Sequence, residues 1–339
     1  MPRAIRLSEA MTDYRLHLQA RGLGERTVKN ALQPLNRAIS EWGDLNTTSI
    51  TGTHIDRIFR SAEWSPATRN LYLGNMRQFF TWCRRENLIS RDFDPTDGWR
   101  NQRVPRIDKM RLPMEEFPDL LNAARHPRDR MICALGIYTF CRGSEIQTLT
   151  WENVDLARHS LGVYRHKTRE SDTLPISTEL AEEIVRWQNW YRRDRHEIRG
   201  NWYLTPSKAP NPTRYNPTTR RIEVTGEFAT LRPDRVATHP YRSVQRALAV
   251  LGYDTRGEGE HTLRRSGARA LFDTLREQGY DGALMRVSSM LGHRDTRVTE
   301  RYIGLSLERQ QRNEMIAGRI MFPGITASAE VTLLRAGSA

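Results

Sequence analysis

The segment LGHRDTRVTERY (residues 291–302) places a histidine, His293, nine residues ahead of a tyrosine, Tyr302. Arginine and glutamate residues surround the tyrosine in the sequence. Tyr302 could simply cap the apolar face of a helix. A phenol, however, has a reference pKa of about 10 and needs local positive charge or a base before it can act as a nucleophile. The basic surroundings therefore suggest a second interpretation, in which Tyr302 attacks an anionic substrate.

A second segment, HTLR, places His261 and Arg264 one turn apart on the same face of a predicted helix. The pattern alone is weak, because the chain is rich in arginine and HxxR occurs five times. Only the copy at His261 is followed by a long helical segment and then by LGH, with a tyrosine nine residues further on. The context therefore selects this copy as a candidate pair of hydrogen-bond donors to a phosphate.

Two further candidate positions precede these segments in the chain. FCRGSEIQTLTWENVD (140–155) places Arg142 at the start of a predicted helix and Glu145 three residues later. These two residues could also form a surface ion pair of little energetic value. Residues 152–177 have a two-residue period that predicts a small antiparallel sheet, with Lys167 at the mouth of its last hairpin. Another position in the hairpin region could take the place of Lys167.

The composition is that of a soluble globular protein with a polyanionic partner. The 339 residues suffice for two domains, and the net charge of +13 makes nucleic acid the leading candidate partner. Three cysteines without a CxxC motif argue for a reducing compartment and against a disulfide framework or a zinc site. No signal peptide is evident, and the longest apolar run, near residues 131–140, is too short to span a bilayer. We therefore expect a cytoplasmic protein without a membrane partner.

Residues 1–98 predict a helical bundle, because apolar residues recur at helical spacing and Ser65 and Pro66 supply an N-cap and a first helical residue. Pro34 is expected to bend or divide the helix that contains it. The best-defined helices cover residues 7–22, 25–43 and 65–87. The aromatic residues of the last helix are interpreted as core rather than as platforms for DNA bases: Phe79, Phe80 and Trp82.

A basic linker is predicted at residues 99–113, where two prolines keep the chain extended. It could be a solvated tether or a strap that contacts DNA phosphates, since such contacts supply affinity independent of sequence. The candidate DNA-binding residues of the linker are Arg100, Arg103, Arg106, Lys109 and Arg111.

A second domain is predicted over residues 114–322, with helices around the small sheet. Residues 177–196 predict a helix, whereas residues 200–240 lack a clear period and are interpreted as a long loop. The remaining chain to about residue 322 is expected to be helical. In the tail, residues 323–339, the segment AEVTLLRA (329–336) predicts a short strand that docks on a neighbouring protomer, or a frayed terminus.

The order of these candidates resembles the catalytic motifs of the tyrosine recombinase (phage integrase) family. Members carry an arginine in a GLRxSEL-like turn, a hairpin lysine, HxLR, LGH, and a tyrosine nine residues after that histidine. The resemblance covers roughly residues 115–305, and the N-terminal bundle is similar to the family's core-site-binding domain. Phe140 and Cys141 replace the usual Gly and Leu, and Arg265 replaces a frequent histidine. The residues that match the motifs are Arg142, Lys167, His261, Arg264, His293 and Tyr302.

The resemblance implies a fold and a chemistry. The fold is mainly α with a small antiparallel β-sheet in the C-terminal domain: a helical N-terminal bundle, a core-DNA-binding domain, followed by an α+β catalytic domain. Tyr302 is the expected nucleophile, and Arg142 and Arg264 are expected to clamp the phosphate oxygens. His293 adds a donor, and His261 is a donor or proton shuttle. Arginine cannot release a proton, so Lys167 is the expected general acid, with Glu145 in support; no metal or other cofactor is expected.

The function implied is that of a site-specific recombinase, an integrase of a phage or other mobile element. It is expected to act as a homotetramer on two double-stranded DNA core sites, possibly with accessory DNA-bending or directionality proteins. Two alternatives stay open: a DNA-relaxing enzyme similar to type IB topoisomerases, and a DNA-binding regulator without catalysis, which would not need Tyr302. Because the predicted bundle starts near residue 7, direct binding to core sites without an arm-site-binding domain is expected.

Overall fold

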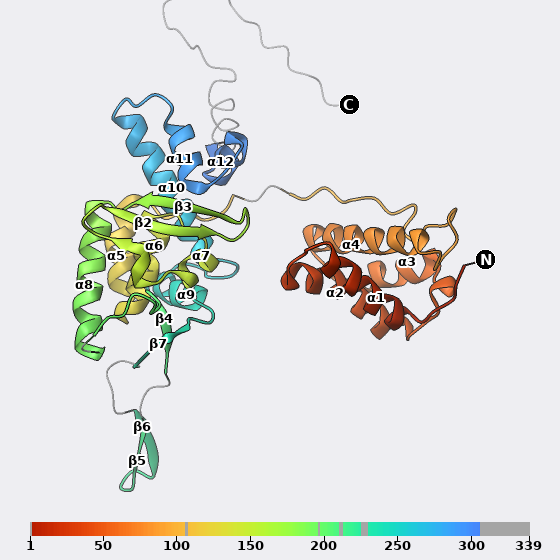
Figure 1. Ribbon diagram of the computed structural model, residues 1–339, viewed down its shortest axis with the longest axis horizontal. Helices are drawn as coiled ribbons and strands as arrows, with labels where there is room; N and C mark the ends of the chain where they lie inside the picture. Colours follow the sequence, from red (N-terminus) through yellow and green to blue (C-terminus); the bar gives the residue numbers. More distant parts are fainter. Residues whose placement is uncertain (1, 106–107, 196, 210–212, 225–229, 306–339) are drawn as a thin grey trace, which may run out of the picture. The chain divides into compact units, whose positions relative to one another are not determined.

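The computed structural model describes residues 2–105, 108–195, 197–209, 213–224 and 230–305. Its contacts divide the chain into two compact units, Met1–Ile107 and Asp108–Ala339, whose elements are labelled in Figure 1. The described chain is mainly helical with small antiparallel sheets, which confirms the predicted fold class. Within these residues, no helix has the length and apolar character needed to cross a membrane.

The first unit is a helical bundle around one apolar core. Its helices are α1 (Leu7–Ala20), α2 (Glu25–Trp42), η1 (Thr47–Ser49), α3 (Gly52–Ser61) and α4 (Pro66–Arg85). Ser65 caps α4 as predicted: its hydroxyl accepts a hydrogen bond from the amide of Thr68 at 3.2 Å, and Pro66 follows as the first helical residue. The core interpretation of the aromatic residues is confirmed, since all three are buried: Phe79, Phe80 and Trp82.

Pro34 does not divide the second helix, so that part of the expectation is wrong. α2 runs through Pro34 for 18 residues. Buried residues lie on both sides of the proline, among them Leu32 and Leu35, so both halves of the helix pack on the same core. Burial of this continuous apolar face offsets the hydrogen bond that the proline ring removes.

The start of the linker is attached to the bundle. The indole Nε1 of Trp99 donates to the Asp56 carboxylate at 2.8 Å. The side chain of Asn70 bonds the backbone of Gln102 twice, once through its amide nitrogen and once through its oxygen, each at 2.8 Å. No helix or strand forms in the described part of residues 99–113, in agreement with the extended prediction.

The helices of the second unit pack around α6 (Pro127–Tyr138). Almost every residue of α6 is buried, in accordance with its nearly continuous apolar sequence. The predicted helix over 177–196 corresponds to α8 (Thr178–Arg195). The other helices are η2 (Met114–Glu116), α5 (Phe117–Ala123), α7 (Gly143–Thr148), η3 (Trp151–Asn153), α9 (Tyr241–Val250), α10 (Glu260–Glu277), α11 (Ala283–Leu291) and α12 (Thr296–Tyr302).

A three-stranded antiparallel sheet forms where the two-residue period predicts it. Its strands are β1 (Val154–Asp155), β2 (Ser160–Arg165) and β3 (Glu170–Pro175), in that order. β3 is an edge strand, which is where a proline such as Pro175 is tolerated. Lys167 lies in the turn between β2 and β3.

The interpretation of residues 200–240 as one long loop is wrong. β4 (Pro206–Lys208) pairs with β7 (Leu231–Val236), and β5 (Thr213–Asn216) pairs with β6 (Arg221–Val224). β4 is too short to show a period, and its partner lies more than twenty residues away in the sequence. The turn after β5 had a local signal, because the Asn216 side chain accepts hydrogen bonds from the next amides, Thr218 and Thr219.

The last three helices pack together beside the β2–β3 hairpin (Figure 1). A separate apolar cluster joins them and includes Phe140, Ala268, Phe272, Ala283, Val287, Leu291 and Ile303. Tyr302 packs against this cluster at the end of α12. The predicted continuation of helix to residue 322 and the predicted strand at 329–336 lie outside the described residues.

Candidate active site

Arg142 and Glu145 form a tight pair at the start of α7. Arg142 is the N-cap, and its backbone amide and its guanidinium each donate to the Glu145 carboxylate at 2.7 Å. The alternative of a surface ion pair is wrong, because Glu145 is only 1% exposed. Burial raises the pKa of Glu145, but the hydrogen bonds from Arg142 and the charge of Arg165 outweigh it and hold the pKa below its ordinary value. The carboxylate is therefore ionised at neutral pH.

Arg165, the last residue of β2, connects three parts of the site. Its guanidinium donates to Glu145 at 3.1 Å, to Asp172 at 2.9 Å and to the backbone oxygen of Met290 at 2.8 Å. Arg165 is not among the site residues predicted from the sequence. A signal existed, since Arg165 occupies an inward position of an alternating strand, where a charged side chain requires partners.

Arg264 lies at the centre of the cluster and is 1% exposed. Its guanidinium donates to the backbone oxygens of Phe140 and Leu291, the latter at 2.6 Å, and lies 3.8 Å from the Glu145 carboxylate. Burial, together with the charge of Arg142, lowers the pKa of Arg264 to about 10, which leaves it charged at neutral pH. His261 lies one turn earlier on α10, and burial, with the charge of Arg264, lowers its pKa as well.

Tyr302 is the last residue of α12 and lies beside these groups. Its hydroxyl donates to the backbone oxygen of His261 at 3.2 Å, and the guanidinium carbon of Arg264 lies 6.0 Å from its ring centre. Burial raises the pKa of Tyr302, against the opposing charges of Arg264, Arg265 and Arg142. The phenol is therefore protonated at neutral pH, and its activation requires a proton acceptor.

His293 faces the tyrosine from the loop between α11 and α12. The two ring centres are 5.7 Å apart and the planes are almost perpendicular, at 88°. Gly292, with φ of 63°, ends α11 in a left-handed conformation that favours glycine, and this turn directs His293 into the site. Burial, with the charges of Arg264 and Arg142, lowers the pKa of His293 to about 4.

Lys167 is exposed in the β2–β3 turn, at the same end of the unit. Its charge is among those that lower the pKa of His293. The preceding residue, His166, attaches the turn to α7, because its Nε2 lies 3.0 Å from the hydroxyl of Thr148. The structure thus brings the motif candidates to one region, with Lys167 on its exposed side.

The charge balance of the cluster favours an anionic ligand. Two carboxylates, the buried Glu145 and the partly exposed Asp172, lie among the guanidinium groups of Arg142, Arg165 and Arg264. Buried cations in excess of carboxylates are costly unless an anion compensates them. Planar guanidinium groups match the geometry of phosphate oxygens and form charge-assisted hydrogen bonds with them.

The linker candidates have different surroundings. Arg100, Arg103 and Lys109 are exposed, whereas Arg106 lies outside the described residues. Arg111 is paired with Asp108 at 2.7 Å, and its guanidinium lies against Gly304, two residues after Tyr302. Arg111 is therefore built into the second unit and is not a free cation of the strap.

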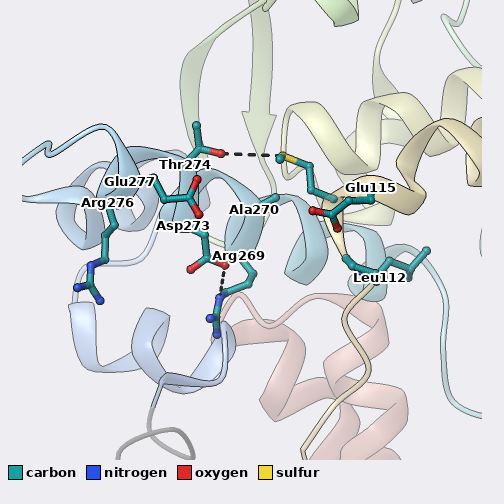
Figure 2. Close-up of a pocket in the computed structure, with 10 residues that line it drawn as sticks. Leu112, Glu115, Arg269, Ala270, Asp273, Thr274, Arg276 and Glu277 are labelled. Carbon is teal, nitrogen blue, oxygen red and sulfur yellow. Dashed lines mark hydrogen bonds and ion pairs between the residues drawn. The ribbon is translucent and has the colours of Figure 1, made fainter.

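A pocket of about 480 Å³ lies between η2 and α10 (Figure 2). Figure 2 shows Arg269 bonded to Asp273 on α10, and Arg269 also donates to the backbone oxygen of Ile303 at 3.3 Å. The residues that line the pocket include none of the motif candidates. This side of α10 supports the residue after Tyr302 but is not the candidate site.

Comparisons with known proteins agree with this arrangement. The sequence pattern of the phage integrase family matches residues 110–309, which is more than half of the chain. Tyrosine recombinase XerA of Thermococcus kodakarensis is 26% identical over 215 residues, which cover 58% of this chain and 72% of that protein.

Solved structures share the fold. A lambda integrase dimer bound to a COC' core site is similar, with a TM-score of 0.65 and 17% identity over 88% of this chain and 77% of that chain. A lambda integrase tetramer bound to a Holliday junction has a TM-score of 0.62 and 17% identity over 86% and 78% of the two chains. With the fold, the clustered motif residues and the match over residues 110–309 in agreement, this chain belongs to the phage integrase family of tyrosine recombinases, enzymes that cleave and rejoin DNA.

Proposed function

We propose that this enzyme is an integrase, which inserts a phage or other mobile element into DNA or excises it, and that Tyr302 is its nucleophile. One observation carries the proposal: the Tyr302 ring centre lies 6.0 Å from the guanidinium carbon of the buried Arg264 and 5.7 Å from the ring centre of His293. A phenol placed against fixed cations can attack an anion that the same cations hold.

The proposed cleavage step forms one bond and breaks one. The hydroxyl oxygen of Tyr302 attacks the phosphorus of a DNA phosphodiester, and the bond to the 5′ oxygen breaks. A 3′-phosphotyrosine bond and a free 5′ hydroxyl result. The phenolic proton passes to the imidazole of His261, whose lowered pKa keeps it neutral and able to accept. Rejoining is the reverse step with the 5′ hydroxyl of another strand, so no external energy source is needed.

Arg142 and Arg264 are the proposed phosphate clamp. Both guanidinium groups are held by Glu145, and Arg264 is also held by two backbone oxygens, so their positions are preorganised. Charge on the non-bridging oxygens grows in the transition state, and each preorganised donor of this kind is worth about 3 to 4 kcal/mol. His293 supplies a further donor.

Lys167 is the proposed general acid for the leaving 5′ oxygen. The guanidinium groups cannot release a proton near neutral pH, whereas an ammonium group can. The position of Lys167 in an exposed hairpin turn supports this role, because the turn can adjust to the leaving strand when DNA binds.

The first unit and the linker are the proposed contacts to the core DNA sites on either side of the cleaved bond. Residues 1–98 then form the core-DNA-binding domain, 99–113 the basic linker, 114–322 the catalytic domain and 323–339 a tail that docks on a neighbouring protomer. Exposed cations of the linker, such as Arg100 and Arg103, are suited to phosphate contacts. The lambda integrase tetramer on a Holliday junction supports an active assembly of four chains on two duplexes.

The test detects the covalent intermediate. Recognition duplexes are first selected from a random pool with the Tyr302→Phe variant, which keeps the binding surface. Wild-type protein is then incubated with a selected duplex nicked beside the cleaved phosphate, and a denaturing gel separates any protein–DNA adduct. We expect an adduct with wild type and with Tyr280→Phe, an exposed control tyrosine, and none with Tyr302→Phe.

A second measurement separates an integrase from a relaxing enzyme. Two labelled duplexes that carry the selected sequence should yield recombinant strands, whereas an enzyme of the topoisomerase type only relaxes a supercoiled plasmid. Absence of an adduct on every selected duplex would refute the proposed chemistry. Relaxation without exchange between duplexes would refute the integrase assignment alone.

A further inference from the structure

The ring of His293 is held by two buried hydroxyl groups in series. Nδ1 of His293 lies 2.9 Å from the hydroxyl oxygen of Thr299, and the Ser288 hydroxyl donates to that same oxygen at 2.7 Å. Thr299 is 0% and Ser288 4% exposed. Ser288 lies on α11 and Thr299 on α12, so the pair also joins the two helices on either side of His293.

The direction of these hydrogen bonds determines which ring nitrogen carries the proton. A hydroxyl group has one hydrogen to donate and can accept through its oxygen. Ser288 donates to Thr299, which leaves the hydrogen of Thr299 available to Nδ1 of His293, 2.9 Å away. In that arrangement Nδ1 accepts, and in a neutral imidazole Nε2 then carries the hydrogen.

The backbone reinforces the same orientation. The amide of His293 donates to the backbone oxygen of Ser288 at 2.9 Å. The left-handed turn at Gly292 makes this bond possible. The backbone amide is thus held by α11 and Nδ1 by α12, whereas Nε2 has no hydrogen-bond partner among the described residues.

We propose that Ser288 and Thr299 are positioning residues that hold His293 as the neutral tautomer protonated on Nε2, so that Nε2 donates a hydrogen bond to the phosphate during cleavage. The catalytic half of this inference rests on the proposed function. The opposite neutral tautomer directs a lone pair at an anionic phosphate and repels it. Because the tautomer is fixed in advance, no free energy is needed to change it before each cleavage.

The surroundings of His293 favour a neutral ring. Arg264 on α10, Arg142 at the start of α7, and Arg165 and Lys167 in the β2–β3 hairpin all place positive charge near it, and the Tyr302 ring packs across it. Burial and these positive charges have the largest effects on its pKa and lower it to about 4. The ring of the free protein is therefore neutral at neutral pH, and a neutral ring can donate from Nε2 only if Nε2 carries the hydrogen.

The first experiment observes the tautomer directly, without DNA. Protein with ¹⁵N-labelled histidine is studied by long-range ¹H–¹⁵N correlation at pH 7, and the His293 signals are assigned by their loss in His293→Gln. We expect an unprotonated Nδ1 and a protonated Nε2. In Thr299→Val, whose methyl group replaces the hydroxyl in the same volume, we expect the Nδ1 signal to shift away from its hydrogen-bonded position. A protonated Nδ1 in wild type would overturn the inference.

The second experiment measures the catalytic consequence with the adduct assay. Loss of one hydrogen bond to the ring is expected to slow adduct formation about tenfold in Thr299→Val. Thr299→Ser, which keeps the hydroxyl, should restore most of the rate. Thr205→Val is the matched control, because it removes an equally buried hydroxyl, bonded to the backbone oxygen of Ile146, from the segment before β4 in the same unit.

A double variant separates positioning from a general structural effect. If Thr299 acts through His293, Thr299→Val should slow adduct formation no further in a His293→Ala background. An equal loss in both backgrounds would overturn the catalytic half of the inference, as would an unchanged rate in His293→Ala. In either case the adduct that depends on Tyr302 tests the proposed function. The tautomer signal, measured without DNA, tests the role of the two hydroxyl groups.

Discussion

The guanidinium of Arg264 lies 3.8 Å from the carboxylate of Glu145, and the two side chains are only 2% and 1% exposed. The same carboxylate bonds Arg142 and Arg165, so one anion orients three cations that come from α7, β2 and α10. Removing either partner of a buried ion pair destabilises the fold, because the remaining charge is left buried without a partner and without solvent. Glu145 thus links the stability of the unit to the geometry of the phosphate clamp.

Glu145→Gln is expected to destabilise the second unit and to slow DNA cleavage. The amide keeps the shape of the carboxylate but leaves Arg142 and the buried Arg165 and Arg264 without their shared anion, at a cost of about 3 kcal/mol. Chemical unfolding measures the loss, and the adduct assay should show a lower rate. Glu182→Gln on the exposed face of α8 is the control and should change neither. Equal stability of Glu145→Gln and wild type would contradict this account of the cluster.

Arg165→Lys is expected to be disruptive although it conserves the charge. A single ammonium group cannot reach Glu145, Asp172 and the backbone of Met290 together. We expect a loss of about 2 kcal/mol in the free energy of unfolding and adduct formation about tenfold slower. Arg158→Lys, in the exposed turn before β2, is the matched change, and its side chain is 85% exposed. If the two variants behave alike, Arg165 does not connect the site.

Gly267→Ala tests the close packing of α10 on α6. A β-carbon at Gly267 would lie 2.0 Å from the backbone oxygen of Ile137, so the helices must move apart and carry Arg264 with them. The cost is expected to be at least about 2 kcal/mol. Gly74→Ala in α4 has open space around the new methyl group and should instead stabilise its helix by about 0.5 to 1 kcal/mol. Hydrogen exchange followed on separate peptides measures the stability of each unit. Similar changes in stability for the two variants would contradict the close packing of α10 on α6.

The low pKa of His293 predicts a dependence of stability on pH. The folded protein holds the neutral ring with a pKa of about 4, whereas the unfolded chain binds a proton near the ordinary value of 6.5. The unfolded state therefore binds more protons between these values, so this contribution is fully present above about pH 6.5 and is lost as the pH falls towards 4. Unfolding free energies measured from pH 7 to 4.5 should fall less steeply in His293→Asn than in wild type. Parallel curves would contradict the assigned pKa.

Much of the fold could be predicted from local pattern. The N-cap at Ser65 and the apolar spacing that follows it define α4, and alternation over residues 152–177 defines the three-stranded sheet. Both patterns depend on neighbours within a few residues, so they can be predicted from the sequence. The β4–β7 pairing and the continuity of α2 through Pro34 depend on partners distant in the chain, so no local pattern predicts them.

The types and the order of the site residues can be read from the amino-acid sequence, because the spacing of HTLR and of LGH to Tyr302 is a property of the chain alone. The burial of Glu145, the place of Arg165 in the cluster and the bond from Thr299 to the ring of His293 are known from the folded structure alone. These three features are contacts between separate elements. Their energies depend on burial and on the direction of hydrogen bonds, which exist only once the helices and the hairpin have packed together.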